Sequence, residues 1–172
     1  KYSIIHYSFV LDAEYVQTIF NSFLAASVSA TMIVMIAIIL GYSARVFDNK
    51  YMKYLLKVAT LGYSIPGAVI AVGIIIVSTS IDKYLIETFE LDYLFLGGTI
   101  LILCFGYTVR FLAVALNSVE SSFEKVGINV NKASRSLNKS LFITLIKIDL
   151  PLIRSGVIAA FILVFIDILK EL

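Results

Sequence analysis

The chain of 172 residues is 60% hydrophobic and only 15% charged, with a mean hydropathy of +0.96 and a formal net charge of +2. Soluble domains average about 45–50% apolar and about 25% charged residues. The composition therefore excludes a water-soluble globule, a disordered chain and a disulfide-stapled secreted domain. The small net charge gives no reason to expect nucleic acid as a partner. The single cysteine, Cys104, cannot form a bridge within the chain.

Four apolar runs predict four membrane spans, because a helix of about 20 mostly apolar residues is long enough to cross the hydrocarbon core. No Asp, Glu, Lys or Arg occurs over residues 15–44, and a second charge-free run covers 58–81. A third run covers 93–109 and resumes after Arg110, and a shorter fourth covers 155–166. The fold predicted is an all-α polytopic transmembrane bundle with spans at about 17–44, 56–79, 93–115 and 152–170.

The basic residues lie mainly in two of the connecting segments, between the first and second spans and between the third and fourth. Ten of the fourteen Lys and Arg residues are there: Arg45, Lys50, Lys53, Lys57, Lys125, Lys132, Arg135, Lys139, Lys147 and Arg154. By the positive-inside rule these segments are cytoplasmic. Residue 1 is then outside, which predicts at least one preceding helix in a longer polypeptide. In that outer segment His6 has no His or Cys neighbour, so we expect an exposed loop histidine and no metal site.

The cytoplasmic loop over 117–151 is long and has its own pattern. Leu137, Leu141, Leu145 and Ile148 recur at helical spacing among basic residues. This predicts short amphipathic helices at the membrane face or against a partner. By physical chemistry alone, a solvated surface facing the lipid headgroups is the simplest interpretation.

The same loop resembles the cytoplasmic motif of bacterial binding-protein-dependent ABC transporter permeases, which reads E-A-A-x-x-x-G, nine residues, then I-x-L-P. The stretch Lys132-Ala133-Ser134-Arg135-Ser136-Leu137-Asn138 falls on the first half, and Ile148-Asp149-Leu150-Pro151 matches the second at the same spacing. Lys132, Ser134 and Asn138 stand where the family has Glu, the second Ala and Gly. The resemblance implies an ATPase-coupling site at Lys132, Ala133, Ser134, Arg135, Ser136, Leu137, Asn138, Ile148, Leu150 and Pro151.

Three further stretches resemble the ferric iron branch of these permeases, in its C-terminal half. They are residues 63–73, which contain S-x-P-G-x-V-x-A-x-G, residues 107–115 and residues 164–172. The resemblance implies a permease subunit of an ATP-driven importer. This importer is expected to move ferric iron that a solute-binding protein delivers. The implied partners are two copies of an ABC ATPase, a second permease half in the same polypeptide or as a dimer, and the lipid of a bacterial inner membrane.

The chain itself is not expected to be an enzyme. No G-x-x-x-x-G-K-[ST] occurs in it, so ATP and Mg²⁺ are expected on the partner ATPase, with no cofactor or metal held by this chain. Two alternatives remain open. One is a permease of the same family for thiamine, putrescine or sulfate. The other is a stand-alone secondary carrier or channel subunit, although carriers usually place carboxylates near the membrane centre, and the first two charge-free runs have none.

Seven residues are candidates for a translocation path or gate: Ser64, Pro66, Gly67, Arg110, Asp167, Lys170 and Glu171. Pro66 predicts a kink within the second span, as packing or as a hinge. Arg110, counted from Tyr93, lies near the cytoplasmic end of its span, which favours snorkelling over a gate. Asp167 can share a helical face with Lys170 or Glu171, either as an ion pair that ends the span or as an outer gate.

Overall fold

The computed structural model describes residues 13–47, 49–90, 93–127, 129–136 and 140–172, and every regular element in these ranges is a helix. The predicted all-α fold is confirmed. In chain order the elements are α2 (Ala13–Val46), α3 (Lys50–Thr60), the 3₁₀-helix η2 (Leu61–Ser64), α4 (Gly67–Phe89), α5 (Ile100–Val126), α6 (Asn129–Ser136), α7 (Leu141–Thr144), the π-helical turn η3 (Leu145–Asp149) and α8 (Leu150–Leu169).

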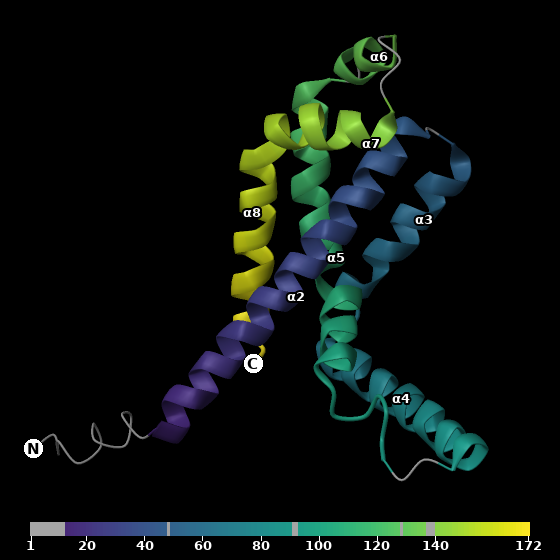
Figure 1. Cartoon of the computed structure of the whole chain (residues 1–172), viewed down its shortest axis with the longest axis vertical. Coiled ribbons are helices and arrows are strands. Elements are labelled where there is room, and N and C mark those ends of the chain that lie inside the picture. The colour runs from purple at the N-terminus through teal and green to yellow at the C-terminus, as the bar shows by residue number, and fades with distance from the viewer. Residues whose placement is uncertain (1–12, 48, 91–92, 128, 137–139) are drawn as a thin grey trace, which may run out of the picture.

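Four helical stretches of the described chain are long and apolar enough to cross a membrane. They are Glu14–Val46, Gly67–Phe89, Ile100–Val126 and the continuous stretch Leu141–Leu169. Three of them, α2, α5 and α8, pack together along most of their length, whereas α4 diverges from the others at the lower end of the bundle (Figure 1).

Small residues bring the three packed helices close together. Ala26, Ala30 and Ala37 of α2 are fully buried in the common core. At the crossing of α5 and α8, a Cβ built on Gly156 would lie 1.7 Å from the Ser122 hydroxyl oxygen. Small residues at such positions let helix backbones approach closely. In lipid, where the hydrophobic effect does not drive helices together, this close packing stabilises their association.

The second apolar run is broken, where the sequence predicted one kinked span over 56–79. That range includes the end of α3, all of η2 and the first part of α4. Proline disfavours the helical conformation of the residue before it, and Ile65 is extended with φ −93° and ψ 134°. Pro66 itself is the N-cap of α4, which continues to Phe89. The membrane-length helix therefore starts about ten residues later than predicted.

The third span also begins later than the predicted residue 93. Residues 93–99 form turns, because the fully buried Asp82 carboxylate binds the backbone there. Asp82 Oδ1 accepts from the Phe95 and Leu96 amides at 3.0 and 2.7 Å, and Oδ2 accepts from the Gly97 amide at 2.7 Å. At its other end α5 continues to Val126, ten residues into the predicted loop over 117–151.

Pro151 explains a bend between α7 and α8. Proline has no N–H for the carbonyl four residues earlier, and its ring collides with that carbonyl. The chain widens there into a π-turn, in which the Leu150 N–H donates to the Leu145 carbonyl. Figure 1 shows α7 lying across the upper end of the bundle and α8 descending from it.

Arg45 joins the end of α2 to the end of α5. Its Nη1 donates to the Phe123 carbonyl at 2.9 Å, Nη2 donates to the Gly127 carbonyl, and the guanidinium carbon lies 5.2 Å from the centre of the Phe123 ring. Carbonyls at a helix C-terminus attract a cation. The sequence placed Arg45 among loop charges, and the structure gives it defined partners.

We expect Arg45→Lys to lower the free energy of unfolding by about 1–2 kcal/mol, because an ammonium cannot bind both carbonyls in the planar arrangement of a guanidinium. A thiol-reactive fluorophore can follow unfolding of the purified protein, since Cys104 is only 3% exposed. The exposed Arg154 offers the matched control Arg154→Lys. Equal melting temperatures for the two variants would contradict the role given to Arg45.

Candidate functional site

A cavity of about 890 Å³ lies between α2, α4 and α5, near the end of α8. Most of its wall is apolar. Its polar lining side chains come from Asn21, Thr99, Tyr107, Arg110 and Glu171. A largely apolar cavity with a few converging polar groups is the usual form of a small-ligand site.

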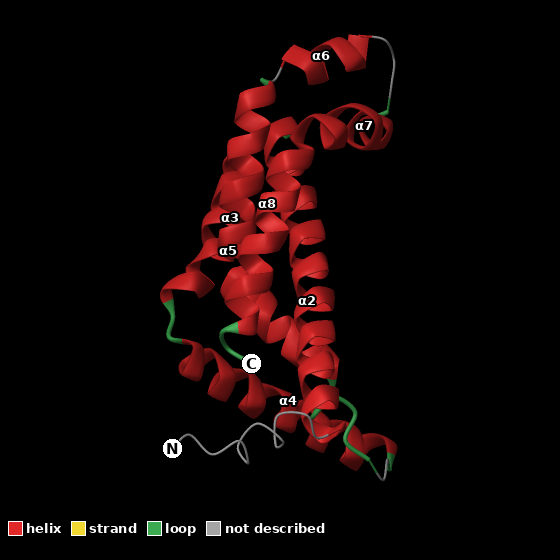
Figure 2. Cartoon of the chain, turned by 90° about the vertical axis from the view of Figure 1, so that its left-hand side faces the viewer, coloured by secondary structure: helices red, strands yellow, loops and turns green. Residues whose placement is uncertain are grey.

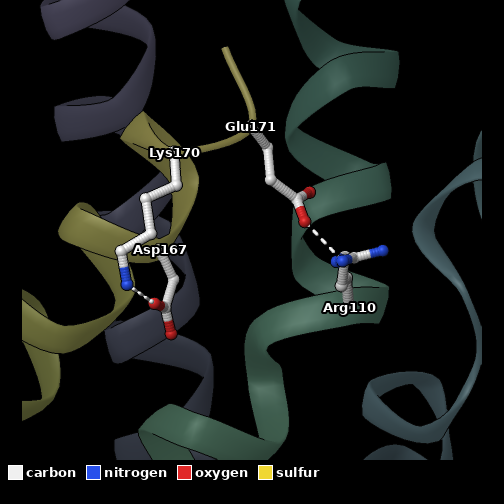
Figure 3. A network of polar contacts seen from close by, with 4 residues as sticks. All are labelled: Arg110, Asp167, Lys170 and Glu171. Atoms are coloured by element: carbon white, nitrogen blue, oxygen red, sulfur yellow. Dashed lines mark hydrogen bonds and ion pairs between the residues drawn. The ribbon is translucent and has the colours of Figure 1, made fainter.

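An ion pair between α5 and the segment after α8 forms part of the cavity wall. Arg110 Nη2 contacts Glu171 Oε1, with the two side chains 26% and 29% exposed (Figure 3). Arg110 Nη1 is buried and has no hydrogen-bond partner among the described residues. Only part of the guanidinium is therefore paired.

Gly67 makes room for this guanidinium at the start of α4. A Cβ on Gly67 would lie 1.7 Å from Arg110 Nη1 and 2.5 Å from Cζ. Among the described residues no side chain caps the beginning of α4, and the contact at Gly67 places the positive end of that helix dipole beside the cation. The start of α4 and the Arg110 guanidinium, both positive, therefore line the same cavity as the Glu171 carboxylate.

A second ion pair lies nearby and is separate from the cavity. Lys170 Nζ donates to Asp167 Oδ1 at 3.0 Å, and the lysine side chain is 69% exposed. Figure 3 shows this pair along the end of α8, while Glu171 reaches across to α5. Of the two partners that the sequence offered Asp167, the structure pairs it with Lys170.

The predicted path residues are thus only partly brought together. Gly67, Arg110 and Glu171 line the cavity, and Pro66 directly precedes its wall, while Ser64 is exposed on η2. Arg110 lies further from the end of its helix than the sequence predicted. Because α5 begins at Ile100, Arg110 is the eleventh of its 27 residues and is ion-paired across the bundle.

Short helices form a layer at the opposite end of the bundle, where α6 lies beyond α7 (Figure 2). The buried Ser134 and Thr144 hydroxyls are 2.7 Å apart and join these two helices. The Tyr42 hydroxyl donates to the Leu141 carbonyl at 3.0 Å and so links α7 to α2. We call α6 and α7, residues 129–136 and 141–144, the end layer.

The predicted coupling residues fall in and around the end layer. Ser134 is buried and Ser136 exposed; Ile148 belongs to η3, and Leu150 and Pro151 begin α8. Lys132, Ala133 and Arg135 lie on α6, where the structure describes only the backbone. Leu137, Asn138 and also His6 lie outside the described residues.

Sequence reasoning missed a second, more polar cavity between α5 and α8, of about 650 Å³. Hydroxyl and amide groups line much of it, from Asn117, Ser118, Ser121, Ser122 and Ser155, together with Lys125. The signal was the concentration of Asn, Ser and Glu residues within 117–122, a stretch that the sequence predicts to be part of a loop. Among the described residues, no group of three His, Cys, Asp or Glu side chains could hold a metal ion.

Comparison with known proteins finds two relevant relatives. The chain is 27% identical over 160 residues to the Fe(3+)-transport system permease protein FbpB 2 of Haemophilus influenzae, covering 93% of this chain and 29% of that protein. It is 28% identical over 156 residues to the molybdate/tungstate transport system permease protein WtpB of Methanocaldococcus jannaschii, covering 91% of this chain and 61% of the relative. No family model matches the chain, and no solved structure does.

The chain thus spans less than two thirds of either relative. The expected resemblance to importer permeases, and to their ferric iron branch, is confirmed. Together with the four membrane-length helices, it supports a multi-pass membrane protein of the transport type.

Proposed function

We propose that this chain is a membrane-spanning part of a permease in an ATP-driven ABC importer, located in a bacterial inner membrane with its basic segments cytoplasmic. The observation that carries the proposal is the similarity to an Fe(3+)-transport permease over 93% of the chain. The expected partners are two ABC ATPase subunits, which bind ATP and Mg²⁺, a solute-binding protein and a second permease half.

Ferric iron is the proposed cargo, on the strength of the same relative. The second relative is named for molybdate and tungstate, which makes an oxyanion the leading alternative cargo within the family. Uptake of radioactive iron, compared between cells with and without the gene, distinguishes ferric iron from an oxyanion as the cargo. A stand-alone carrier or channel is the alternative from another class.

The geometry suggests how ATPase movement could reach the cavity. The end layer joins η3 and α8, and α8 leads directly to Glu171 on the cavity wall. The connection is helical over Leu141–Leu169, so a shift of the end layer transmitted along it would alter the contact between Glu171 and Arg110. ATP binding can drive such a change only if the ATPases bind the two permease conformations with different affinity.

Purification of the full-length protein in mild detergent, followed by mass spectrometry, tests the proposal. We expect a P-loop ATPase to copurify at a stoichiometric ratio. Arg135→Glu and Leu137→Asp should each reduce ATPase recovery and uptake at least about tenfold, because both fall in the motif that implies ATPase docking. A tenfold loss corresponds to about 1.4 kcal/mol of docking free energy.

The control is Lys50→Glu, a charge reversal at the beginning of α3, outside the coupling motif. It should leave ATPase recovery unchanged. If the protein purifies alone, and uptake survives both α6-region substitutions, the importer assignment is wrong and the carrier alternative leads.

A further inference from the structure

The charges around the cavity between α2, α4 and α5 suit an anion better than a bare cation. Its charged lining residues are Arg110 and Glu171, which neutralise each other. Gly67 and Ala68, at the uncapped beginning of α4, also line it and add the positive end of a helix dipole. A small trivalent cation needs several hard oxygen ligands, and here one carboxylate is already bound to a guanidinium.

Arg110 has hydrogen-bonding capacity that Glu171 does not use. A guanidinium carries five N–H donors in a planar fork that fits two oxygens of one anion. Nη2 contacts the Glu171 carboxylate, whereas Nη1 is covered by the start of α4 and has no partner among the described residues. A buried donor without a partner is unfavourable, so a conformation that provides one gains stability.

The position of α4 makes such a conformation accessible. Among the helices, α4 packs mainly against α5, and most of its side chains are exposed. A small shift of its start away from Arg110 would uncover Nη1 without disturbing the core of α2, α5 and α8. The helix whose start covers Arg110 Nη1, α4, is thus the least buried of the four membrane-length helices.

We propose that the cavity binds an anion with oxygen donors at Arg110, and that the Glu171 carboxylate occupies this site in its absence. The anion replaces Glu171 at Nη2, and its second oxygen reaches Nη1 when the start of α4 moves. This inference rests on the proposed function and refines its cargo. The species that enters would be an oxyanion or a metal ion carried in an anionic complex.

Direct binding to the purified full-length permease tests the inference without requiring transport. Isothermal titration with molybdate, phosphate, citrate and ferric citrate separates the possible sources of the anion. Binding of molybdate or phosphate supports a free oxyanion, and binding of ferric citrate but not citrate supports an anionic metal complex. Absence of binding by all four probes, to both wild type and Glu171→Gln, would overturn the proposal.

Two substitutions should act in opposite directions. Glu171→Gln removes the internal competitor and should tighten binding of the effective probe about tenfold. Arg110→Gln should weaken it at least tenfold, and Arg110→Lys, which keeps the charge without the fork, should lie between. Asp167→Asn breaks the neighbouring ion pair away from the cavity and should leave binding unchanged. If Glu171→Gln and Arg110→Gln weaken binding alike, the pair is only structural.

Failure of this inference can be told from failure of the importer assignment. If the ATPase copurifies but no anion binds, the anion site is wrong and the importer assignment stands. If no ATPase copurifies, the importer assignment fails whether or not an anion binds.

Discussion

Replacement of Asp82 by alanine is expected to lower the free energy of unfolding by about 2–3 kcal/mol. The Asp82 carboxylate is buried and accepts three backbone N–H groups, from residues 95, 96 and 97. Alanine leaves these donors without their acceptor, and each unpaired buried donor costs about 1–3 kcal/mol where water cannot replace the bond. Partial exposure of the turn limits the total.

Two further variants identify the cause of that loss. Asp82→Asn keeps one carbonyl oxygen and should show a smaller destabilisation than Asp82→Ala. Asp167→Asn removes a partly exposed carboxylate from an ion pair at the surface and should change stability by less than about 1 kcal/mol. Melting of the purified protein, followed through the reaction of Cys104 with a fluorescent maleimide, provides the comparison. Equal melting temperatures for Asp82→Ala and wild type would show that the turn does not depend on this carboxylate.

Gly62→Ala is expected to lower the free energy of unfolding by about 3 kcal/mol, because the atoms nearest to a Cβ at Gly62 belong to the backbone of α5. A Cβ on Gly62 would lie 1.9 Å from the Val109 carbonyl oxygen and 2.8 Å from its carbon. A side chain could rotate away, but here η2 must move off α5, and such overpacking typically costs about 1–3 kcal/mol. Since Val109 directly precedes Arg110, we also expect uptake to fall.

Gly73→Ala is the matched control on α4. No atom lies within 4 Å of the Cβ it would add, and alanine is the better helix former by about 1 kcal/mol. The two alanine substitutions should therefore shift the melting temperature in opposite directions. A Gly62→Ala protein as stable as wild type would mean that η2 and α5 are not in the close contact described.

The existence of the helices could be predicted from the sequence better than their limits. Apolar runs of membrane length are a strong signal, and each overlaps a membrane-length helix in the structure. Where the second helix begins depends on whether Pro66 kinks or ends a helix, and both are compatible with the sequence. Where α5 begins depends on Asp82, whose contacts are 13–15 residues away along the chain.

The candidate site was harder to predict because its members come from distant segments. Gly67 and Arg110 are both candidates from the sequence, yet nothing in the sequence shows that the guanidinium packs on that glycine. For Glu171 the sequence allows either an ion pair that ends the span or an outer gate, and its reach to α5 follows from how α8 crosses α5. Asp82 directly follows the second charge-free run, and burial of a single carboxylate leaves no local pattern in the sequence.

The π-turn before Pro151 also determines how α8 is rotated about its own axis relative to the helix before the turn. Each residue of an α-helix turns the chain by about 100°, so the additional residue in this turn determines which face α8 presents below it. Deleting one residue within 145–149 would carry Gly156 away from its contact with α5 and the buried Ile153 out of the core, and would replace them with side chains that now point outward. The widened turn therefore acts as an angular offset between the end layer and the membrane helix. It lets the two parts of one helical stretch match two differently oriented surfaces.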